Sequence, residues 1–301
     1  MLDRARRQFE QLKPMLGERL GEKLSDKLSE NKWRSSHGHS GSRFPLNSRL
    51  TENTIRLLSF NIQAGLNSKA YKDYITTSVS QFMPTPPDLL NLNEIGSLLS
   101  DYDVVALQEV DGGSLRSGYI NQLAHFAEQG GFPYWHQQLN RDFGRLGQYS
   151  NGLLSRIIPY SIEDHRLPGV RGRGAIVTRY GNPESPLIVI GLHLALGEKG
   201  RYRQLEYVKE LIRPYQHVII MGDMNCCADS LIDTPLRDTN LRPAATSTNT
   251  YPSWAPTRTI DHILVTPNLK VNAVNVLNCQ LSDHCPVAIE VTLPESVIST
   301  S

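Results

Sequence analysis

Seven short apolar runs, each rich in Val, Ile and Leu, constrain the fold more than any other feature of the sequence. Runs of this length and β-branched content are typical of buried strands. They occupy residues 55–62, 103–110, 174–180, 186–194, 217–224, 259–265 and 286–293. Helices are expected over residues 88–100, 117–130 and 201–213. Because several strands follow one another without a helix between them, the order favours an α+β fold with a sandwich of mixed sheets flanked by helices.

The first 54 residues differ in pattern from the rest of the 301-residue chain. Residues 1–34 predict an amphipathic helical segment, interrupted by Pro14, in which apolar side chains recur mostly every three or four positions. These side chains are Leu2, Phe9, Leu12, Leu16, Leu20, Leu24 and Leu28. Such a stripe needs a partner, and for residues 1–32 the main domain, a second copy of the chain and a membrane surface all remain open.

The other domain boundaries follow from composition and from the strand pattern. Residues 35–54 are rich in Ser, Gly and His, which predicts a flexible linker. Residues 55–295 contain all the predicted strands and form the main domain. Residues 296–301 are expected to be a C-terminal tail.

Charge is distributed unevenly along the chain. Residues 1–54 contain 11 Lys and Arg against 7 Asp and Glu, whereas the remainder contains 20 against 23. A dedicated DNA-binding domain usually has a basic face that neutralises several phosphates. The main domain does not have that overall charge.

The sequence favours an intracellular protein. Its N-terminus carries charges at positions 3, 4, 6 and 7 without the apolar region of a secretory signal, and no run of about 18 apolar residues occurs. Four cysteines lack the CxxC spacing of a structural zinc site, so we expect reduced thiols at Cys226, Cys227, Cys279 and Cys285. The expected location is cytoplasmic, with peripheral membrane contact as an open alternative.

Polar residues stand where five of the predicted strands end or are interrupted. Taken singly, each suits a turn, a surface acid or a hydrogen-bonded core histidine. They are Asn61, Glu109, His193, the pair Asp223 and Asn225, and Asp261. Because side chains at strand ends converge on one edge of a sheet, these residues, with Asp283 and His284 in LSDHCP, predict one common site.

This set of side chains suits phosphoester hydrolysis. Asn61, Glu109 and one or both of Asp223 and Asp283 offer the oxygen ligands that Mg²⁺ or Mn²⁺ prefers. Such a cation polarises a phosphoryl oxygen and stabilises a departing oxyanion. His193 and His284 are available as donors to phosphoryl oxygens near neutral pH.

Seven sequence blocks resemble those of the endonuclease/exonuclease/phosphatase superfamily, in the same order. They are LLSFNIQ, ALQEVD, NGLLSR, GLHL, GDMNC, TIDHILV and LSDHCPV, between about residues 55 and 293. The superfamily includes pancreatic deoxyribonuclease, abasic-site endonucleases, neutral sphingomyelinases and inositol-polyphosphate 5-phosphatases. The resemblance implies a four-layer α/β sandwich in which two mixed β-sheets pack face to face between flanking helices. It also implies that residues 55–295 form the catalytic domain of a metal-dependent phosphoric ester hydrolase.

The resemblance assigns roles to the site residues. Asn61 and Glu109 would be metal-site residues, and Asp283 would complete the metal shell or orient the nucleophile. The catalytic set would be His193, Asp223, Asn225, Asp261 and His284. Within it, Asp223 would activate the attacking water, and His284 would donate to the phosphoryl oxygen with Asp261 as its carboxylate partner. A carboxylate on one ring nitrogen favours the imidazolium form.

Substrate contacts are expected from residues flanking this set. Asn151, Arg201 and Gln204 match family positions near the site, and Asn225 would hold the phosphate or the water. Arginines in loops are expected to bind substrate phosphate, although the same arginines would equally suit solvent-exposed loops without a substrate role. These arginines are Arg116, Arg156, Arg171 and Arg173. Tyr251 and Trp254 line the mouth of the site or pack a hairpin.

The sequence leaves the natural substrate open. The segment before Asp261, TYPSWAPTRTID, is shorter than the Trp- and Arg-rich stretch of abasic-site endonucleases. That segment, the charge of the main domain and the N-terminal stripe favour a small or lipid-linked phosphodiester or phosphomonoester. RLPGVRGRG favours the alternative, a Mg²⁺-dependent endo- or exonuclease acting on DNA or RNA. An inactive scaffold recruited to a membrane or partner is a third hypothesis, which the competent side chains at every expected position disfavour.

Overall fold

The computed structural model describes residues 38–39, 53–65, 86–143, 147–231, 233–245 and 249–298. The predicted amphipathic segment 1–34 lies outside these residues, as does nearly all of the predicted linker 35–54. Contacts divide the chain into Met1–Gly38 and His39–Ser301. A two-residue strand, β1 (Gly38–His39), falls at that boundary.

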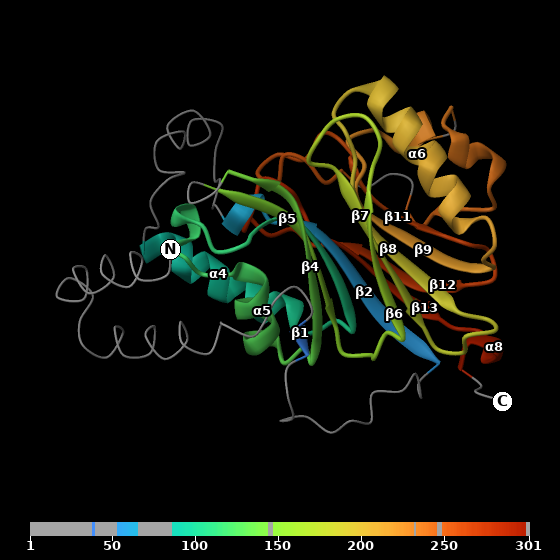
Figure 1. Ribbon diagram of the computed structural model, residues 1–301, viewed down its shortest axis with the longest axis horizontal. Coiled ribbons are helices and arrows are strands. Elements are labelled where there is room, and N and C mark those ends of the chain that lie inside the picture. The colour runs from blue at the N-terminus through green and yellow to red at the C-terminus, as the bar shows by residue number, and fades with distance from the viewer. Residues whose placement is uncertain are drawn as a thin grey trace. The chain divides into compact units, whose positions relative to one another are not determined.

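Six strands of the first sheet follow one another in the order β4-β5-β3-β2-β13-β12 (Figure 1). Their bounds are β4 (Tyr134–Asp142), β5 (Gln148–Ser155), β3 (Val104–Asp111), β2 (Thr54–Asn61), β13 (Val287–Thr292) and β12 (Lys270–Val276). Only β2 and β3 pair in parallel, with Asn61 opposite Gln108. The carboxyl ends of these two strands therefore lie at the same edge of the sheet.

The second sheet repeats this arrangement. Its order is β10-β11-β9-β8-β7-β6. The bounds are β10 (Arg242–Pro243), β11 (Asp261–Val265), β9 (His217–Asp223), β8 (Leu187–His193), β7 (Gly174–Tyr180) and β6 (Ser161–Arg166). The parallel pair is β8 and β9, with His193 opposite Asp223. Asp261, the first residue of β11, lies opposite Asp223 on the other side.

The two sheets pack face to face through one apolar core. Alternate residues of β2 and β3, such as Leu57 and Ala106, contact a cluster that includes Val189 of β8 and Met221 of β9. The sheets approach so closely at Gly191 that a Cβ atom there would lie 2.9 Å from the Cβ of Ala106. This alternation of inward residues is how a sandwich of two sheets is built.

Helices cover the outer faces of both sheets. On the first sheet lie α4 (Pro86–Leu99) and α5 (Gln122–Gly130), whose Ile95 and Phe126 pack with Phe60 and Leu107. On the second lies α6 (Glu198–Ile212), whose Leu205 packs into that sheet's outer core (Figure 1). The shorter elements are η2 (Gln63–Gly65), η3 (Leu115–Ser117), α7 (Ala228–Leu231), η4 (Pro235–Asp238) and α8 (Glu295–Ile298). The expected four-layer sandwich of two mixed sheets is confirmed.

Three expectations about individual elements need correction. The helix expected over 117–130 begins only at Gln122, because Asn121 caps it by accepting a hydrogen bond from the backbone N–H of Ala124. Strands β4, β6 and β12 were missed because edge strands and half-exposed strands carry polar residues in place of apolar runs. The largely buried strand β5 was missed too, because its sequence QYSNGLLS has no continuous apolar run. The tail expected at 296–301 is wrong at its start, since Val297 of α8 is fully buried in the core.

No helix in the described part of the chain is long and apolar enough to cross a lipid bilayer.

The close approach of the sheets predicts the effect of a single methyl group. Gly191→Ala should lower the free energy of unfolding by about 1–3 kcal/mol, because the added Cβ forces β8 away from Ala106. Urea denaturation monitored by circular dichroism measures this change. Gly197→Ala adds the same methyl where no atom lies within 4 Å, and it should cost less. Equal losses in the two variants would contradict this account of the sheet spacing.

Candidate active site

The predicted site residues converge where the parallel strand pairs of the two sheets end. Asn61 ends β2, His193 ends β8, Asp223 ends β9 and Asp261 begins β11. The side chains of these four residues are all at least nine-tenths buried. The convergence at one edge is the arrangement that the sequence predicted for them.

Asp223 lies at the centre of the cluster and links the two sheets. Asn61 Nδ2 donates to Asp223 Oδ2 at 3.1 Å, and His193 Nε2 lies 3.3 Å from the same oxygen. The backbone N–H of Asn225 donates to Oδ1 at 2.9 Å. Burial alone raises the pKa of Asp223, but the nearby His193 and His284 lower it more, so the pKa is well below its ordinary value. Asp223 is therefore a buried carboxylate at neutral pH.

Asp261 and His284 form a second buried pair beside Asp223. His284 Nδ1 lies 2.8 Å and 3.0 Å from the two carboxylate oxygens of Asp261, and Thr250 Oγ1 donates to Asp261 Oδ2 at 2.6 Å. Burial lowers the pKa of His284, but the charge and hydrogen bond of Asp261 outweigh burial and raise it to about 10. His284 is thus an imidazolium at neutral pH.

The second ring nitrogen of His284 faces the centre of the site. His284 Nε2 lies 4.0 Å from Asp223 Oδ2 and 4.0 Å from Asp283 Oδ1, beyond hydrogen-bonding distance of either. The Tyr251 ring lies against the imidazole, with centroids 5.0 Å apart. The Nε2–H group therefore faces the gap between the Asp223 and Asp283 carboxylates. An oxygen atom bound in that gap could accept a hydrogen bond from it.

Glu109 and Asp283 bring two further carboxylates to this edge. Burial raises the pKa of Asp283 to about 6. The charge of Glu109 adds to this rise, and the charge of His284 opposes it. Glu109 has a left-handed φ of 59°, at the point where the register between β3 and β5 shifts. A bulge of this kind re-aims a side chain and is costly for a non-glycine residue.

A cation fits the oxygen donors of this edge. The buried Asp283 and the half-buried Glu109 repel each other, and a divalent cation bound at this edge would offset that repulsion. The Asn61 Oδ1 amide oxygen, which accepts from the backbone N–H of Gln63 at 3.1 Å, is an additional hard donor. Carboxylate and amide oxygens are the ligands of Mg²⁺ or Mn²⁺.

A different triplet in the described chain has potential ligand atoms within 4.8 Å of one another, namely Asp223, Asp261 and His284. Its imidazole is already committed through Nδ1 to Asp261, and Asp261 also accepts from Thr250. The contacts of this triplet therefore show how the His284 ring is oriented, through Asp261 and Thr250.

Asp111, the last residue of β3 and two residues after Glu109, anchors the loop that follows the strand. Asp111 accepts hydrogen bonds from the backbone N–H groups of Gly113 and Ser114 and from the hydroxyls of Ser114 and Ser117. Arg116 lies 3.0 Å from the same carboxylate. Burial raises the pKa of Asp111, but these hydrogen bonds and the Arg116 charge outweigh burial, so the pKa lies below its ordinary value.

Two of the arginines expected to bind substrate serve the fold instead. Arg116 is buried, paired with Asp111 and stacked over the Tyr149 ring at 4.2 Å, so the expected phosphate contact is corrected to a structural role. Arg156 donates to the carbonyl groups of Ser100 and Gly130 at 2.7 Å each, which satisfies the last turns of α4 and α5.

The other flanking residues also have partners within the protein. Arg201 donates to the carbonyl of Leu196, and Gln204 bridges the carbonyl of Pro168 and the N–H of Ala195. The Asn151 amide donates to the carbonyl of Gly174 at 3.0 Å, and the Asn225 amide donates to the carbonyl of Leu194 at 3.0 Å. Arg201 and Gln204 therefore support the segment after β8 and the loop before β7, in place of the expected substrate contact.

Arg173 differs from these arginines because it lies near the site carboxylates. Burial lowers its pKa, and the charges of Asp223 and Glu109 partly restore it. It precedes Gly174, whose partner across the sheet is His193. Of the four loop arginines singled out in the sequence, Arg173 is the one whose pKa responds to the charges of Asp223 and Glu109.

Two supporting residues were not predicted as site residues. Thr250 holds Asp261, and Ser282 Oγ donates to the backbone carbonyl of Asn61 at 2.8 Å. Ser282 flanks Asp283 in the LSDHCP block, so its position was a usable signal. A single buried hydroxyl such as Thr250, in a loop without periodicity, gives none.

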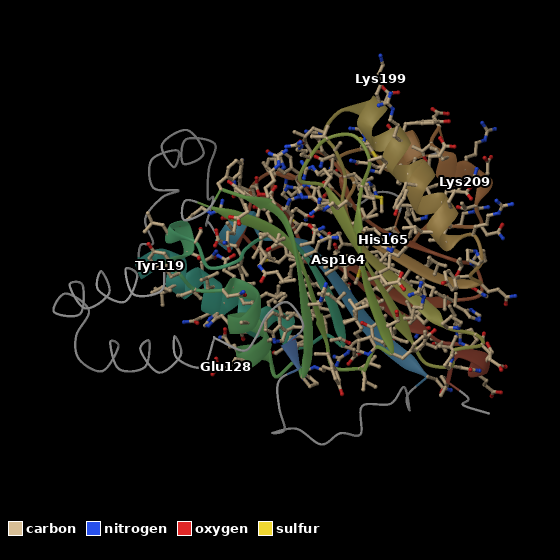
Figure 2. The ribbon with its side chains drawn as sticks, in the orientation of Figure 1. Tyr119, Glu128, Asp164, His165, Lys199 and Lys209 are labelled. Atoms are coloured by element: carbon tan, nitrogen blue, oxygen red, sulfur yellow. The ribbon has the colours of Figure 1, made fainter. Side chains whose placement is uncertain are left out.

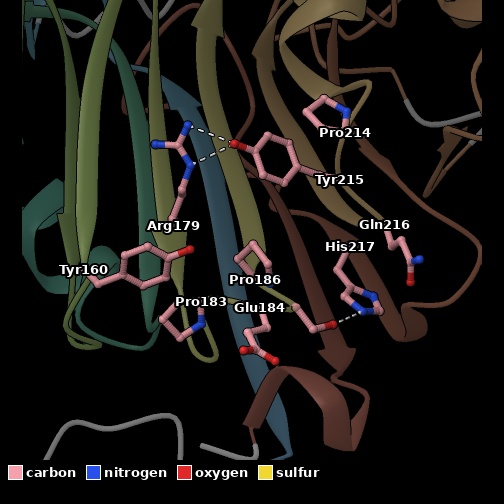
Figure 3. Close-up of a pocket in the computed structure, with 10 residues that line it drawn as sticks. Tyr160, Arg179, Pro183, Glu184, Pro186, Pro214, Tyr215, Gln216 and His217 are labelled. Atoms are coloured by element: carbon pink, nitrogen blue, oxygen red, sulfur yellow. Dashed lines mark hydrogen bonds between the residues drawn. The ribbon is translucent and has the colours of Figure 1, made fainter.

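A cavity of about 310 Å³ lies at the other end of the strands (Figure 3). Its lining includes His217, the first residue of β9, whereas Asp223 is the last. Arg179 is bound to Glu163 and to the Tyr215 hydroxyl, and the ring nitrogens of His217 lie within 3.1 Å of Ser185 Oγ and Asn268 Nδ2. These polar groups bond to other residues of the protein, and none of the predicted site residues lines the cavity.

Comparisons with known proteins agree with this geometry. A family model described as "Endonuclease/Exonuclease/phosphatase family" matches residues 58–284. No curated protein sequence matches the chain.

Solved structures share the fold at low sequence identity. An endonuclease/exonuclease/phosphatase from Beutenbergia cavernae is 19% identical, with a TM-score of 0.61, 80% of this chain covered and 72% of the other. A mannosyl-6-phosphatase from Bacteroides thetaiotaomicron is 19% identical, with a TM-score of 0.57 and coverages of 79% and 99%. The human Nocturnin catalytic domain with bound sulfate is 17% identical, with a TM-score of 0.56 and coverages of 80% and 94%.

The Asp111 network predicts a pH-dependent stability. Asp111→Asn should lower the free energy of unfolding by about 3–5 kcal/mol at neutral pH, because it leaves Arg116 buried without a counter-charge. The folded-state pKa of Asp111 is depressed, so its contribution is fully present above the unfolded pKa of about 4 and is lost as the pH falls through the folded value.

Denaturant titrations of both proteins at a series of pH values check this. The difference between them should be constant from neutral pH to about pH 5 and shrink below about pH 4. Asp238→Asn, which removes an exposed partner of Lys209, should change stability much less. A difference that does not depend on pH would contradict the role given to Asp111.

Proposed function

Since the chain belongs to the endonuclease/exonuclease/phosphatase family, whose members hydrolyse phosphoester bonds, we propose that it is a divalent-metal-dependent phosphoesterase acting by in-line attack of water. The proposed metal is Mg²⁺ or Mn²⁺. The preferred substrate is a small or lipid-linked phosphodiester or phosphomonoester. The phosphatase named among the structural neighbours supports a small phosphoester.

The observation that carries the proposal is the placement of His284. Asp261 holds the ring through Nδ1 at 2.8 Å, and Nε2 faces Asp223 and Asp283 at 4.0 Å each. A doubly protonated ring in this position donates to the oxygen on which negative charge develops. A buried carboxylate next to it, Asp223, accepts a proton.

We assign Asn61, Glu109 and Asp283 as the residues that would hold the metal. When bound there, a divalent cation would polarise the phosphoryl group and neutralise its charge. The fit rests on the paired carboxylates of Glu109 and Asp283 and on the amide oxygen of Asn61.

The remaining residues act on the water and on the phosphate. Asp223 orients the attacking water and takes its proton as the new P–O bond forms and the bond to the leaving oxygen breaks. His284 donates a hydrogen bond to a non-bridging oxygen, and Arg173 adds positive charge beside it. His193 and Asn225 keep Asp223 in position through the contacts at 3.3 Å and 2.9 Å.

A nuclease acting on DNA or RNA is the second candidate. The loop between β6 and β7 carries Arg171 and Arg173 with no acidic residue, which favours a polyanionic substrate. Hydrolysis of a panel of oligonucleotides, phospholipids and sugar phosphates distinguishes the candidates. Affinity for a nucleic acid would fall steeply as the salt concentration rises, because arginines that bind phosphates displace the counterions condensed on the nucleic acid.

We also propose an intracellular location. The four cysteines are free, and burial raises the pKa of both Cys226 and Cys285 to about 11. Reduced, unreactive thiols are typical of proteins from reducing compartments.

His284→Gln should lower kcat by about 10²–10³-fold, since it removes a donor to the developing oxyanion. Asp223→Asn should lower kcat by about 10²–10⁴-fold by removing the acceptor of the water proton. Both are measured with bis-(p-nitrophenyl) phosphate at saturating metal. His165→Gln, at a half-buried histidine bonded to Tyr207, is the control and should keep normal turnover. Near-normal kcat in His284→Gln would refute the proposed mechanism.

Metal removal gives an independent test of the proposed ligands. Dialysis against a chelator should abolish turnover, and Mg²⁺ or Mn²⁺ should restore it. Glu109→Gln should raise the metal concentration for half-maximal activity at least about tenfold. Glu163→Gln, on the outer strand β6, should leave that concentration unchanged. Full activity after chelation would exclude metal dependence.

A further inference from the structure

Three loops around the mouth of the site are tied to one another, and together we name them the rim. They are the described residues of the β4–β5 hairpin (141–143 and 147–149), the β6–β7 loop (167–173) and the segment after β8 (194–200). Arg141 Nη2 donates to the carbonyl of Arg171 at 2.7 Å, which joins the first two loops. Gln204 joins the last two by donating to Pro168 and accepting from Ala195.

Each rim loop presents an apolar side chain to solvent. Phe143 is 57% exposed, Val170 is 51% exposed and Leu196 is 76% exposed. Leu196 lies three residues after His193, and Val170 lies three residues before Arg173. The three side chains lie on loops that hydrogen bonds tie together, and exposed apolar side chains on adjoining loops indicate a contact with another apolar phase.

Basic side chains surround these apolar tips. The described residues of the rim hold four cations against two acids, Asp142 and Glu198. The cations are Arg141, Arg171, Arg173 and Lys199, and Arg166, Arg201 and Arg203 flank them together with Asp164. Figure 2 shows Lys199 at the end of α6 that starts beside the rim, far from Lys209. The cations lie on a main domain whose residues after position 54 have 20 basic against 23 acidic side chains.

We propose that the rim docks on an anionic lipid surface, with Phe143, Val170 and Leu196 entering the headgroup region and the basic side chains pairing with lipid phosphates. Apolar side chains among cations are the pattern that binds such interfaces, each basic residue adding to the attraction. Nucleic acid explains the cations and Phe143, on which a base can stack, but not Val170 and Leu196, which neither stack on bases nor form hydrogen bonds with them.

Docking in this orientation places the mouth of the site against the bilayer. Resting on the proposed function, it favours a phosphoester in a lipid headgroup as the substrate. The docking itself depends only on the rim, so a vesicle-binding measurement stands even if no phosphoester is hydrolysed.

Co-sedimentation of the full chain with vesicles of phosphatidylcholine, with and without phosphatidylserine, tests the proposal. Binding should require phosphatidylserine and weaken as salt rises. The double variant Val170→Gln, Leu196→Gln should weaken binding at least about tenfold, because it removes the apolar contribution to insertion. Arg171→Gln should weaken it about three- to tenfold.

Matched controls lie away from the rim. Ile158→Gln changes an apolar residue that is 45% exposed in the β5–β6 turn, and Arg213→Gln changes an arginine that is 78% exposed at the far end of α6. Both should bind vesicles like the unsubstituted chain, and melting temperatures check that all variants fold.

Several results would overturn the proposal. One is vesicle binding that the rim substitutions do not alter, which assigns it to another part of the chain. Equal binding to both vesicle types is a second. The third is absence of vesicle binding with tight binding of a single-stranded oligonucleotide, which assigns the cations of the rim to nucleic acid.

Discussion

The hydrogen bond from Asn61 to Asp223 is the contact on which the site depends, because it joins the last residue of a strand in one sheet to the last residue of a strand in the other. A buried carboxylate is costly unless hydrogen bonds and opposite charges surround it. Asp223 obtains these from β2, β8 and the turn after β9. The register of both sheets must therefore be correct before this charge can be buried.

The topology explains why such distant residues meet. Of the strand pairs described above, one in each sheet is parallel, β2 with β3 and β8 with β9, and each brings two carboxyl ends to the same edge. The described helices α4, α5 and α6 lie over the outer faces of the sheets (Figure 1). The chemistry is therefore supplied by strand ends, while the loops beyond them shape the approach to it.

Much of this was predictable from the sequence. Buried strands such as β8 and β9 are continuous apolar runs, and the polar residues that end them, His193 and Asp223, stand out against those runs. Edge strands gave no such signal: β6 reads SIEDHR, and one face of it is open to solvent. Its existence depends on pairing with β7, which is a tertiary contact.

The same limit applies to the site. The type of a residue such as Glu109 or His284 suggests what it can do, and the strand pattern places it. Whether an arginine faces substrate or a buried acid depends on packing, which is why Arg116 was misassigned and Arg173 was not distinguished from it. The support that Asp261 receives from Thr250 likewise depends on a loop conformation that no local pattern specifies.

The spacing between the sheets at Gly191 has a consequence for how such an enzyme diversifies. A bulkier residue at this position would separate the layers and, with them, the two halves of the constellation that meets at Asp223. Substrate specificity can instead change through insertions or substitutions in the loops beyond the strand ends, because these leave the distance between the sheets unchanged. The loops can therefore vary in sequence and length, whereas the close packing of the two sheets at Gly191 restricts variation in the core.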